Sequence, residues 1–244
     1  MIRSLEVCAI VAAAGSGTRL GLGSKALLKV NGKSLIARAV ELFGGLEEIG
    51  RVVLVAPPGR LEQTRREVEA LASPKPVLVC PGGETRQQSV RAGLAVLGAC
   101  DYVLVHDAAR PLATPDLVRR VLAAAIERGA AIPGLPPRDA VKRVEAGRLV
   151  ESMDRSRLVL VQTPQGFRYQ LLERAHFEAA DAGLAGDDDS QLVAAAGHPV
   201  AVVAGEPTNI KLTTPEDLQV LEAILQQLEA VDPAGAGGGR PSPR

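Results

Sequence analysis

A short apolar run near the N-terminus leads directly into a glycine-rich loop, and this succession constrains the fold more than any other feature of the sequence. Residues 7–11 (VCAIV) are uncharged and partly β-branched, as is typical of a strand buried in a parallel sheet. In the loop that follows, Gly15 and Gly17 allow a sharp turn that brings backbone N–H groups close to an anion, and Arg19 and Lys25 place positive charge beside it. The sequence therefore predicts a strand that ends in a phosphate-binding loop.

The spacing within this loop fits neither of the common phosphate-binding templates. A dinucleotide-binding GxGxxG motif would need glycine at Leu20, and a P-loop ending at Lys33 and Ser34 would need glycine at Leu27. The observed pattern, GxGxR with a lysine six residues later, resembles the signature loop of the sugar nucleotidyltransferases, in which the arginine and the lysine flank the phosphorus under attack. The alternative is a tight turn with two solvated cations. If the loop binds a nucleotide, the expected contact residues are Ala13, Ala14, Gly15, Ser16 and Gly17.

The charge balance and the scarcity of aromatic residues argue against a nucleic-acid partner. Lys+Arg and Asp+Glu both number 28, so no net basic field attracts a polyanion. Aromatic residues make up 2% of the chain, so a base has few rings to stack on and is expected to be recognised by backbone groups. With 244 residues and 46% apolar content the chain can bury one large core, and a single domain over residues 1–231 is the simplest organisation.

The cysteines and the hydropathy pattern favour a cytoplasmic protein without a membrane segment. Cys8, Cys80 and Cys100 are odd in number and far apart, and no CxxC or Cys/His cluster suggests zinc, so reduced thiols are expected. No run reaches the roughly 18 apolar residues that span a bilayer, and residues 1–6 lack the hydrophobic region of a signal peptide. Residues 232–244 are rich in glycine and proline and are predicted to form a disordered tail.

Strand-like and helix-like segments alternate along most of the chain. Strands are predicted at residues 51–56, 77–80, 102–105 and 130–133, and helices at 34–46, 61–72, 86–97 and 114–129. The C-terminal part is predicted to contain strands at 159–162 and 200–203, a loop at 163–167, and helices at 169–180, 191–196 and 214–229. This alternation predicts a Rossmann-like α/β fold, with a mostly parallel sheet and helices on both faces.

Two further turns follow predicted strands, and ligands of open α/β sheets bind at the carboxyl ends of strands. At the first turn, the amides of Gly83 and Glu84 and the hydroxyl of Ser89 are predicted to recognise a base edge, although an ordinary strand-to-helix connection fits equally well. At the second, Asp107 is the predicted protein ligand of Mg²⁺, because this ion binds through one or two carboxylates and substrate phosphates. The alternative for Asp107 is a turn-capping residue, and His106 is expected to point into packing.

Two charged segments near the C-terminal half are open to more than one interpretation. Lys211 lies between apolar neighbours just before a capped helix, so it is a candidate third cation for the phosphates, although a surface lysine is the usual alternative. Residues 187–189 are three adjacent acids, which are expected to form the acidic N-terminus of a helix rather than a metal site.

Residues 138–157 break the alternation of strands and helices. Charged residues alternate there with a few apolar ones around Gly147, a pattern that fits a two-stranded β-arm turning near residues 145–147. Because an isolated hairpin is only marginally stable in water, the arm is expected to pack on a second copy of the chain. An irregular surface excursion of the monomer is the alternative.

Six motifs, in order over most of residues 7–222, together point to one family. They are AAAGSGTRLG, GGETRQQSV, VHDAARP, RDAVKRV, QTPQGF and NIKLTTPEDL. With these motifs the chain resembles the 2-C-methyl-D-erythritol 4-phosphate cytidylyltransferases of isoprenoid biosynthesis. The resemblance implies transfer of a cytidylyl group from CTP to the polyol phosphate with release of pyrophosphate, dependence on Mg²⁺, and a homodimer whose arms complete each other's sites.

The resemblance also implies roles for individual residues. They are catalytic cations at Arg19, Lys25 and Lys211, cytosine recognition at Gly83, Glu84 and Ser89, and substrate or metal contacts at Asp107, Arg110, Arg155, Thr163 and Lys211. Ala140 departs from the family pattern, because the usual residue after Arg138 and Asp139 carries a hydroxyl that helps to bind the substrate phosphate.

Other functions remain open at this point. Ala140 leaves room for a cytidylyltransferase that acts on another polyol phosphate, such as ribitol 5-phosphate. A non-catalytic nucleotide-binding domain is the alternative from a different class. It is disfavoured by the presence of Arg19, Lys25, Asp107 and Lys211. A nicotinamide oxidoreductase is disfavoured because the third fingerprint glycine is missing.

Overall fold

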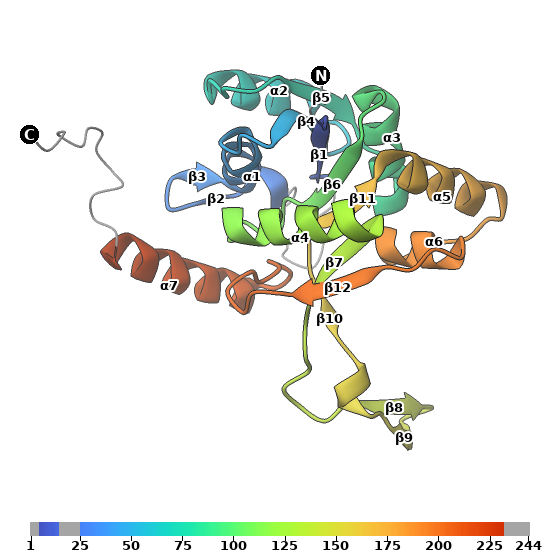
Figure 1. The fold of residues 1–244 in the computed structure, drawn as a ribbon. Coiled ribbons are helices and arrows are strands. Elements are labelled where there is room, and N and C mark those ends of the chain that lie inside the picture. The colour runs from blue at the N-terminus through green and yellow to red at the C-terminus, as the bar shows by residue number, and fades with distance from the viewer. Residues whose placement is uncertain (1–4, 15–24, 232–244) are drawn as a thin grey trace, which may run out of the picture.

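The fold is built on one central sheet, which contains eight strands among the residues described (Figure 1). The structure is a computed structural model that describes residues 5–14 and 25–231. The strands lie in the order β10-β7-β11-β6-β1-β4-β5, with β12 beside β7. Their bounds are β1 Val7–Ala12, β4 Ile49–Ala56, β5 Val77–Pro81, β6 Tyr102–Asp107, β7 Ala130–Leu135, β10 Leu160–Val161, β11 Gln165–Arg168 and β12 Ala201–Ala204. The predictions for Gly15, Ser16, Gly17, Arg19 and the tail at 232–244 lie outside the described residues.

The order in which successive parallel strands are added to the sheet reverses at β1. Along the chain, β4 and β5 are added on one side of β1, whereas β6 is added on the other side. A crevice opens at such a switch point, outside the carboxyl ends of the two strands. Ala12 of β1 lies opposite Asp107 of β6 in the register, so the chain leaves β1 next to this carboxylate. The mostly parallel Rossmann-like sheet predicted from the sequence is confirmed.

Helices cover both faces of the sheet, because alternate strand residues point to opposite sides. Val7, Ala9 and Val11 of β1 pack with one group of helices, and Cys8 and Ile10 pack with the other. The first group is α1 Leu35–Gly44, α2 Leu61–Ala70 and α4 Pro115–Arg128, and the second is α3 Arg86–Leu97, α5 Tyr169–Asp181 and α6 Asp189–Ala195. Each helix lies within a few residues of its predicted position.

The C-terminal helix lies beside a small hairpin near the site. After the short 3-10 helix η2 (Lys25–Leu27), strands β2 (Lys29–Val30) and β3 (Lys33–Ser34) form a two-stranded sheet. Helix α7 (Pro215–Val231) packs on this region through Leu221 and Leu225. None of the helices that the structure describes is long and apolar enough to cross a membrane.

Residues 165–168 correct one prediction, because they form a strand and not a loop. β11 runs antiparallel between β6 and β7, with Phe167 fully buried. An added Cβ on Gly166 would lie 3.0 Å from Val121 Cγ1 and 3.1 Å from Ala125 Cβ, so the close approach of α4 to this strand favours glycine. The segment was mistaken for a loop because Thr163, Pro164, Gln165 and Gly166 give it little apolar character.

The predicted β-arm is present. β8 (Lys142–Glu145) and β9 (Arg148–Ser152) pair antiparallel, and Ala146 and Gly147 turn between them with φ of 47° and 76°. The hairpin extends away from the sheet and its helices, as Figure 1 shows. Val144, Leu149 and Val150 of the arm are exposed to solvent.

Candidate active site

The candidate site lies at the carboxyl edge of the sheet, where β1 and β6 end side by side. The amide of Ala108 donates to the carbonyl of Ala12 at 3.0 Å, which joins the two chain segments that leave these strands. Asp107 is the last residue of β6, so its backbone is fixed by the sheet while its side chain faces the edge. The position predicted for this carboxylate is therefore confirmed, although β6 is two residues longer than expected.

Asp107 is bound by two cations that come from distant parts of the chain. Arg86 Nε donates to Oδ1 at 2.9 Å, and Lys211 Nζ donates to Oδ2 at 2.6 Å. Burial alone would raise the pKa of Asp107, but the charges of Arg86 and Lys211 outweigh burial and hold this pKa far below its usual range. The carboxylate is therefore ionised at neutral pH.

Lys25 lies beside the short segment that carries Lys211, and the two lysines were predicted from sequence to act together. Lys25 Nζ donates to the carbonyls of Leu212 and Thr213, each at 3.2 Å. The amide of Leu212 donates to the carbonyl of Ala109 at 2.8 Å, which ties this segment to the turn after Asp107. Two lysines that are far apart in sequence thus lie at one edge, as a site for phosphates requires.

The second glycine turn lies against the first loop. An added Cβ on Gly82 would lie only 2.3 Å from Ala14 Cβ, so the two loops are in close contact at this glycine. The amide of Gly83 donates to Ser89 Oγ at 3.1 Å, and the amide of Glu84 donates to Gln88 Oε1 at 2.8 Å. These amides, predicted to recognise a base, are thus used within the turn, because Ser89 accepts the first and Gln88, which also caps α3, accepts the second.

Thr163 and His106 form a buried polar pair below Asp107. Thr163 Oγ1 accepts the Asp107 amide at 3.1 Å and lies 3.1 Å from His106 Nδ1, while His106 Nε2 lies 3.1 Å from the carbonyl of Arg110. A carbonyl can only accept, so Nε2 carries the proton and the Thr163 hydroxyl donates to Nδ1. Burial lowers the pKa of His106 to about 4. The hydroxyl predicted to contact substrate is therefore directed inward, where it holds the backbone of Asp107.

Arg110 was predicted to line the substrate side, and its guanidinium is instead used to join chain segments. Its Nη1 donates to the carbonyl of Asn209 at 2.8 Å, and its Nη2 donates to the carbonyl of Val161 at 3.2 Å. Asn209 is fully buried and donates through Nδ2 to the carbonyl of Thr163 at 2.9 Å. These bonds fix the chain just before Lys211.

Arg155 does not lie at the carboxyl edge of the sheet in its own chain. It lies on η3 (Arg155–Arg157), which follows β9 at the base of the arm, and its Nη1 donates to the carbonyl of Arg138 at 2.8 Å. The arm extends away from the sheet (Figure 1), so Arg155 belongs to the protruding part of the molecule.

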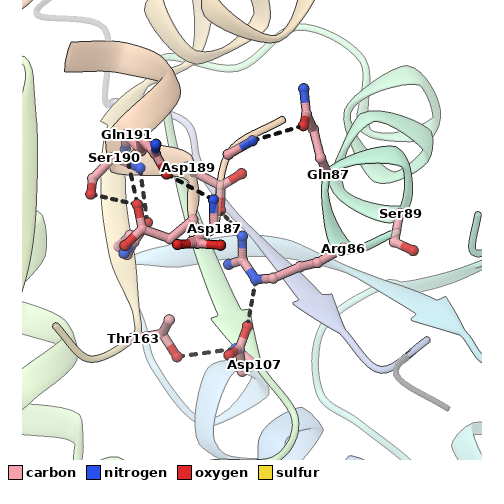
Figure 2. A network of polar contacts seen from close by, with 12 residues as sticks. Arg86, Gln87, Ser89, Asp107, Thr163, Asp187, Asp189, Ser190 and Gln191 are labelled. Carbon is pink, nitrogen blue, oxygen red and sulfur yellow. Dashed lines mark hydrogen bonds and ion pairs between the residues drawn. The ribbon is translucent and has the colours of Figure 1, made fainter. Parts of the chain in front are cut away.

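Three residues of the site's polar network were missed by the sequence analysis. Arg86 Nη1 donates to Asp189 Oδ2 at 2.7 Å, and His176 Nε2 lies 2.8 Å from Asp189 Oδ1 (Figure 2 shows the arginine between the two aspartates). Asp188, as predicted for this acidic run, caps α6, but Asp189 is buried in the network. No spacing signal links residues 86, 107, 176 and 189, because the fold alone brings them together.

The donor set at the edge suits anions more than it suits a preformed metal cage. Among the described residues, no group of three or more His, Cys, Asp or Glu side chains could hold a metal ion. Asp107 is nevertheless a suitable single ligand for Mg²⁺, because this ion takes one or two carboxylates and completes its shell with phosphates and water. Each Asp107 oxygen keeps a lone pair beyond the hydrogen bond it accepts.

Comparison with known proteins agrees with this geometry. The family model described as 2-C-methyl-D-erythritol 4-phosphate cytidylyltransferase matches residues 7–227. A protein of that name from Geobacillus thermodenitrificans is 42% identical over 218 residues, which cover 89% of this chain and 96% of the relative. A crystal structure of the enzyme of the same name from Thermus thermophilus has a TM-score of 0.75 and 38% identity over 91% of this chain and 100% of that chain.

Some relatives are longer. A bifunctional enzyme IspD/IspF from Anaeromyxobacter dehalogenans is 44% identical over 230 residues, which cover 93% of this chain but 58% of the relative. The chain thus spans little more than half the length of such bifunctional relatives. Because the family match extends from β1 to α7 and the shorter relative is covered almost completely, the chain belongs to the 2-C-methyl-D-erythritol 4-phosphate cytidylyltransferase family.

Proposed function

We propose that the protein transfers the cytidylyl group of CTP to 2-C-methyl-D-erythritol 4-phosphate and releases pyrophosphate. The observation that carries this proposal is that Lys211 contacts Asp107 at the end of β6, while Lys25 contacts the backbone immediately after Lys211. Family membership supports the choice of nucleotide and acceptor.

The acceptor phosphate is already an anionic nucleophile at neutral pH, so the reaction needs no general base. Its difficulty lies in bringing two highly negative groups together in line, and positioning and charge neutralisation supply the acceleration. In our proposal Lys25 and Lys211 exchange their internal partners for phosphate oxygens and stabilise the charge at the α-phosphorus as it becomes five-coordinate. Arg19, which lies outside the described residues, is proposed as the third cation.

The proposal includes dependence on Mg²⁺, with Asp107 as the protein ligand. Bound there, the ion would neutralise negative charge on the triphosphate and the leaving pyrophosphate. Arg86 keeps Asp107 ionised whether or not Lys211 moves to the substrate, because its contact is with the other carboxylate oxygen.

We also propose a homodimer in which the arm brings Arg155 to the site of a second copy. The exposed Val144, Leu149 and Val150 support this, because a hairpin with solvated apolar side chains gains stability by packing. A cytoplasmic location is proposed from the three free thiols, two of which, Cys8 and Cys80, are buried.

Release of pyrophosphate from CTP and Mg²⁺ tests the function, with separate reactions that contain 2-C-methyl-D-erythritol 4-phosphate, ribitol 5-phosphate or no acceptor. We expect release with the first acceptor at a kcat/KM well above that for ribitol 5-phosphate. A preference for ribitol 5-phosphate would contradict the proposed acceptor, and no release with either would contradict nucleotidyl transfer.

A further inference from the structure

Arg86 bridges two carboxylates that belong to different elements. Its Nε contacts Asp107 at the end of β6, and its Nη1 contacts Asp189 in the first turn of α6, at 2.9 and 2.7 Å (Figure 2). Burial alone would lower the pKa of Arg86, but Asp189 and Asp107 raise it above its usual value. The guanidinium is therefore a fixed cation between two anions, and its fork geometry fits both of them at once.

This contact restricts the orientation of the Asp107 carboxylate. With Oδ1 bound to Arg86, Oδ2 is the oxygen that meets Lys211. The Asp107 backbone is held separately, through its amide and Thr163 Oγ1. Without Arg86 the backbone would stay in place, but the carboxylate could rotate and exchange its oxygens.

The position of Arg86 is fixed by contacts with α6 and with the segment that leads into it. Asp189 is 1% exposed in its side chain and also contacts His176, which is equally buried. Gln87 Nε2 donates to the carbonyl of Leu184 at 3.1 Å, and Gln87 Oε1 accepts the amide of Gly186 at 3.2 Å. The start of α3 is thereby bound to the segment that leads into α6, so the position of Arg86 does not depend on ligand.

We propose that Arg86 is a positioning residue for the reaction: braced by Asp189 and His176, it orients Asp107 so that one carboxylate oxygen faces Lys211 and the phosphates. This inference rests on the proposed cytidylyl transfer. It assigns Arg86 an effect on turnover through Asp107 and none on recognition of the base by the glycine turn.

The separation from nucleotide recognition follows from the capping of α3. Thr85 Oγ1 accepts the Gln88 amide at 3.1 Å, and Gln88 Oε1 accepts the amides of Glu84 and Thr85 at 2.8 and 3.3 Å. These bonds hold the glycine turn without the Arg86 side chain. A change confined to that side chain should leave the turn intact.

The test compares Arg86→Lys with the matched control Arg51→Lys. Lysine keeps the charge but cannot bridge two carboxylates with a planar fork. Arg51 is also partly buried and paired with a carboxylate, that of Glu6, but it lies on β4 far from the strands' carboxyl ends. We expect Arg86→Lys to lower kcat at least about tenfold, while Kd for CTP from calorimetry without Mg²⁺ changes less than about threefold, because misplacing a catalytic group slows chemistry without weakening uniform binding. Arg51→Lys should change neither quantity.

The outcomes separate this inference from the proposed function. A kcat within twofold of wild type for Arg86→Lys, or an equal loss of kcat and of CTP affinity, would overturn the role of Arg86. If Arg86→Lys does not fold, the variant Asp189→Asn tests the inference, because it removes only the charge of Asp189 that holds Arg86. A lower kcat with unchanged CTP affinity would then support the inference, and an unchanged kcat would overturn it. Wild-type protein without pyrophosphate release would contradict the proposed function instead.

Discussion

Lys211 meets Asp107 at a half-exposed position, with 46% of the lysine side chain open to solvent. The Asp107 side chain is only 9% exposed, so the pair joins a solvent-accessible ammonium to a buried carboxylate. Arg86 contacts the other carboxylate oxygen, so Asp107 keeps a cationic partner when the ammonium turns to a phosphate oxygen. In the proposed reaction, the pair with Asp107 keeps the lysine near the edge until substrate binds.

Lys211→Ala should lower kcat about a hundred- to a thousandfold, because it removes one preorganised donor to the reacting phosphorus. Lys33→Ala is a close control, since Lys33 Nζ also contacts a carboxylate oxygen at 2.6 Å, that of Glu41, and its side chain is 43% exposed. Steady-state pyrophosphate release measures both variants. Near-normal turnover of Lys211→Ala would exclude Lys211 from catalysis.

His106 predicts a loss of stability in mild acid. Its pKa is about 4 in the folded protein and about 6.5 in an unfolded chain, so between these values only the unfolded chain takes up the proton. The stabilisation that neutral His106 gives to the folded protein is therefore complete above pH 6.5. As the pH falls toward 4, the free energy of unfolding declines by up to about 3 kcal/mol. Urea unfolding from pH 7 to 4.5 measures it.

The control for this prediction is His106→Gln, which keeps a donor for the carbonyl of Arg110 but does not titrate. The free energy of unfolding of this variant should fall less steeply over the same pH interval. Equal slopes for the variant and the wild type would assign the acid sensitivity to other groups.

At the scale of elements, the site depends on the contact between two loops that leave β1 and β5. Gly82 lies against Ala14, and the carbonyl of Ala56 would be 3.0 Å from an added Cβ. Because both neighbours are short or part of the backbone, neither can rotate away. The distance between Ala14 and the turn that leads into α3 is therefore set by one glycine.

Gly82→Ala should separate these loops and raise KM for CTP about tenfold, with a loss of about 1 to 3 kcal/mol in the free energy of unfolding from overpacking. Gly50→Ala is the control, because the nearest atom to its added Cβ is the carbonyl of Val7 at 3.6 Å, an ordinary contact. Unchanged KM in Gly82→Ala would show that CTP does not depend on this spacing.

Helix boundaries were predictable from the sequence where local signals are strong. Ser34 caps α1, and Thr114, Pro115 and Gly129 bound α4 as predicted, because caps and glycine stops act over a few residues. β6 was predicted too short because His106 and Asp107 are polar, and their burial depends on partners such as Thr163 and Arg86 that lie elsewhere in the sequence.

For the site, the sequence predicted which kinds of residue take part but not how they contact one another. The glycine turn, Asp107 and the two lysines were found from motifs, and the structure places them at one edge. The sequence does not show which hydrogen-bond donors of the site already have partners within the protein. The partners of the Gly83 amide and the Thr163 hydroxyl follow from side-chain geometry. The contact of Arg86 with Asp189 joins residues 103 positions apart and has no local signature.

At the scale of the whole molecule, the arm separates Arg155 from the edge that holds Lys211. Along the chain, β7 leads out to the arm and β10 returns antiparallel beside it, so the arm emerges from the sheet's end opposite β5. In the proposed dimer, each site would combine the cations of one copy with the arm of the other. Such a two-fold arrangement gives both sites the same composition.

This arrangement predicts complementation between two inactive variants, Arg155→Ala and Lys211→Ala. In a randomly exchanged equal mixture, about a quarter of all sites should be intact, because half of the dimers are mixed and each has one complete site. Pyrophosphate release by the mixture, compared with each variant alone, measures this. A mixture as inactive as its components would place Arg155 in the site of its own chain, provided that native mass spectrometry shows mixed dimers.

The internal partners of Lys25 and Lys211 bear on which solutes can compete with substrate. Both ammonium groups already donate to oxygen atoms of the protein, Lys25 to two carbonyls and Lys211 to a carboxylate. A monovalent ion such as chloride offers too little charge to displace these bonds, whereas a triphosphate replaces several of them at once. In the proposed reaction, the ligand-free edge would therefore discriminate against monovalent anions and in favour of a triphosphate.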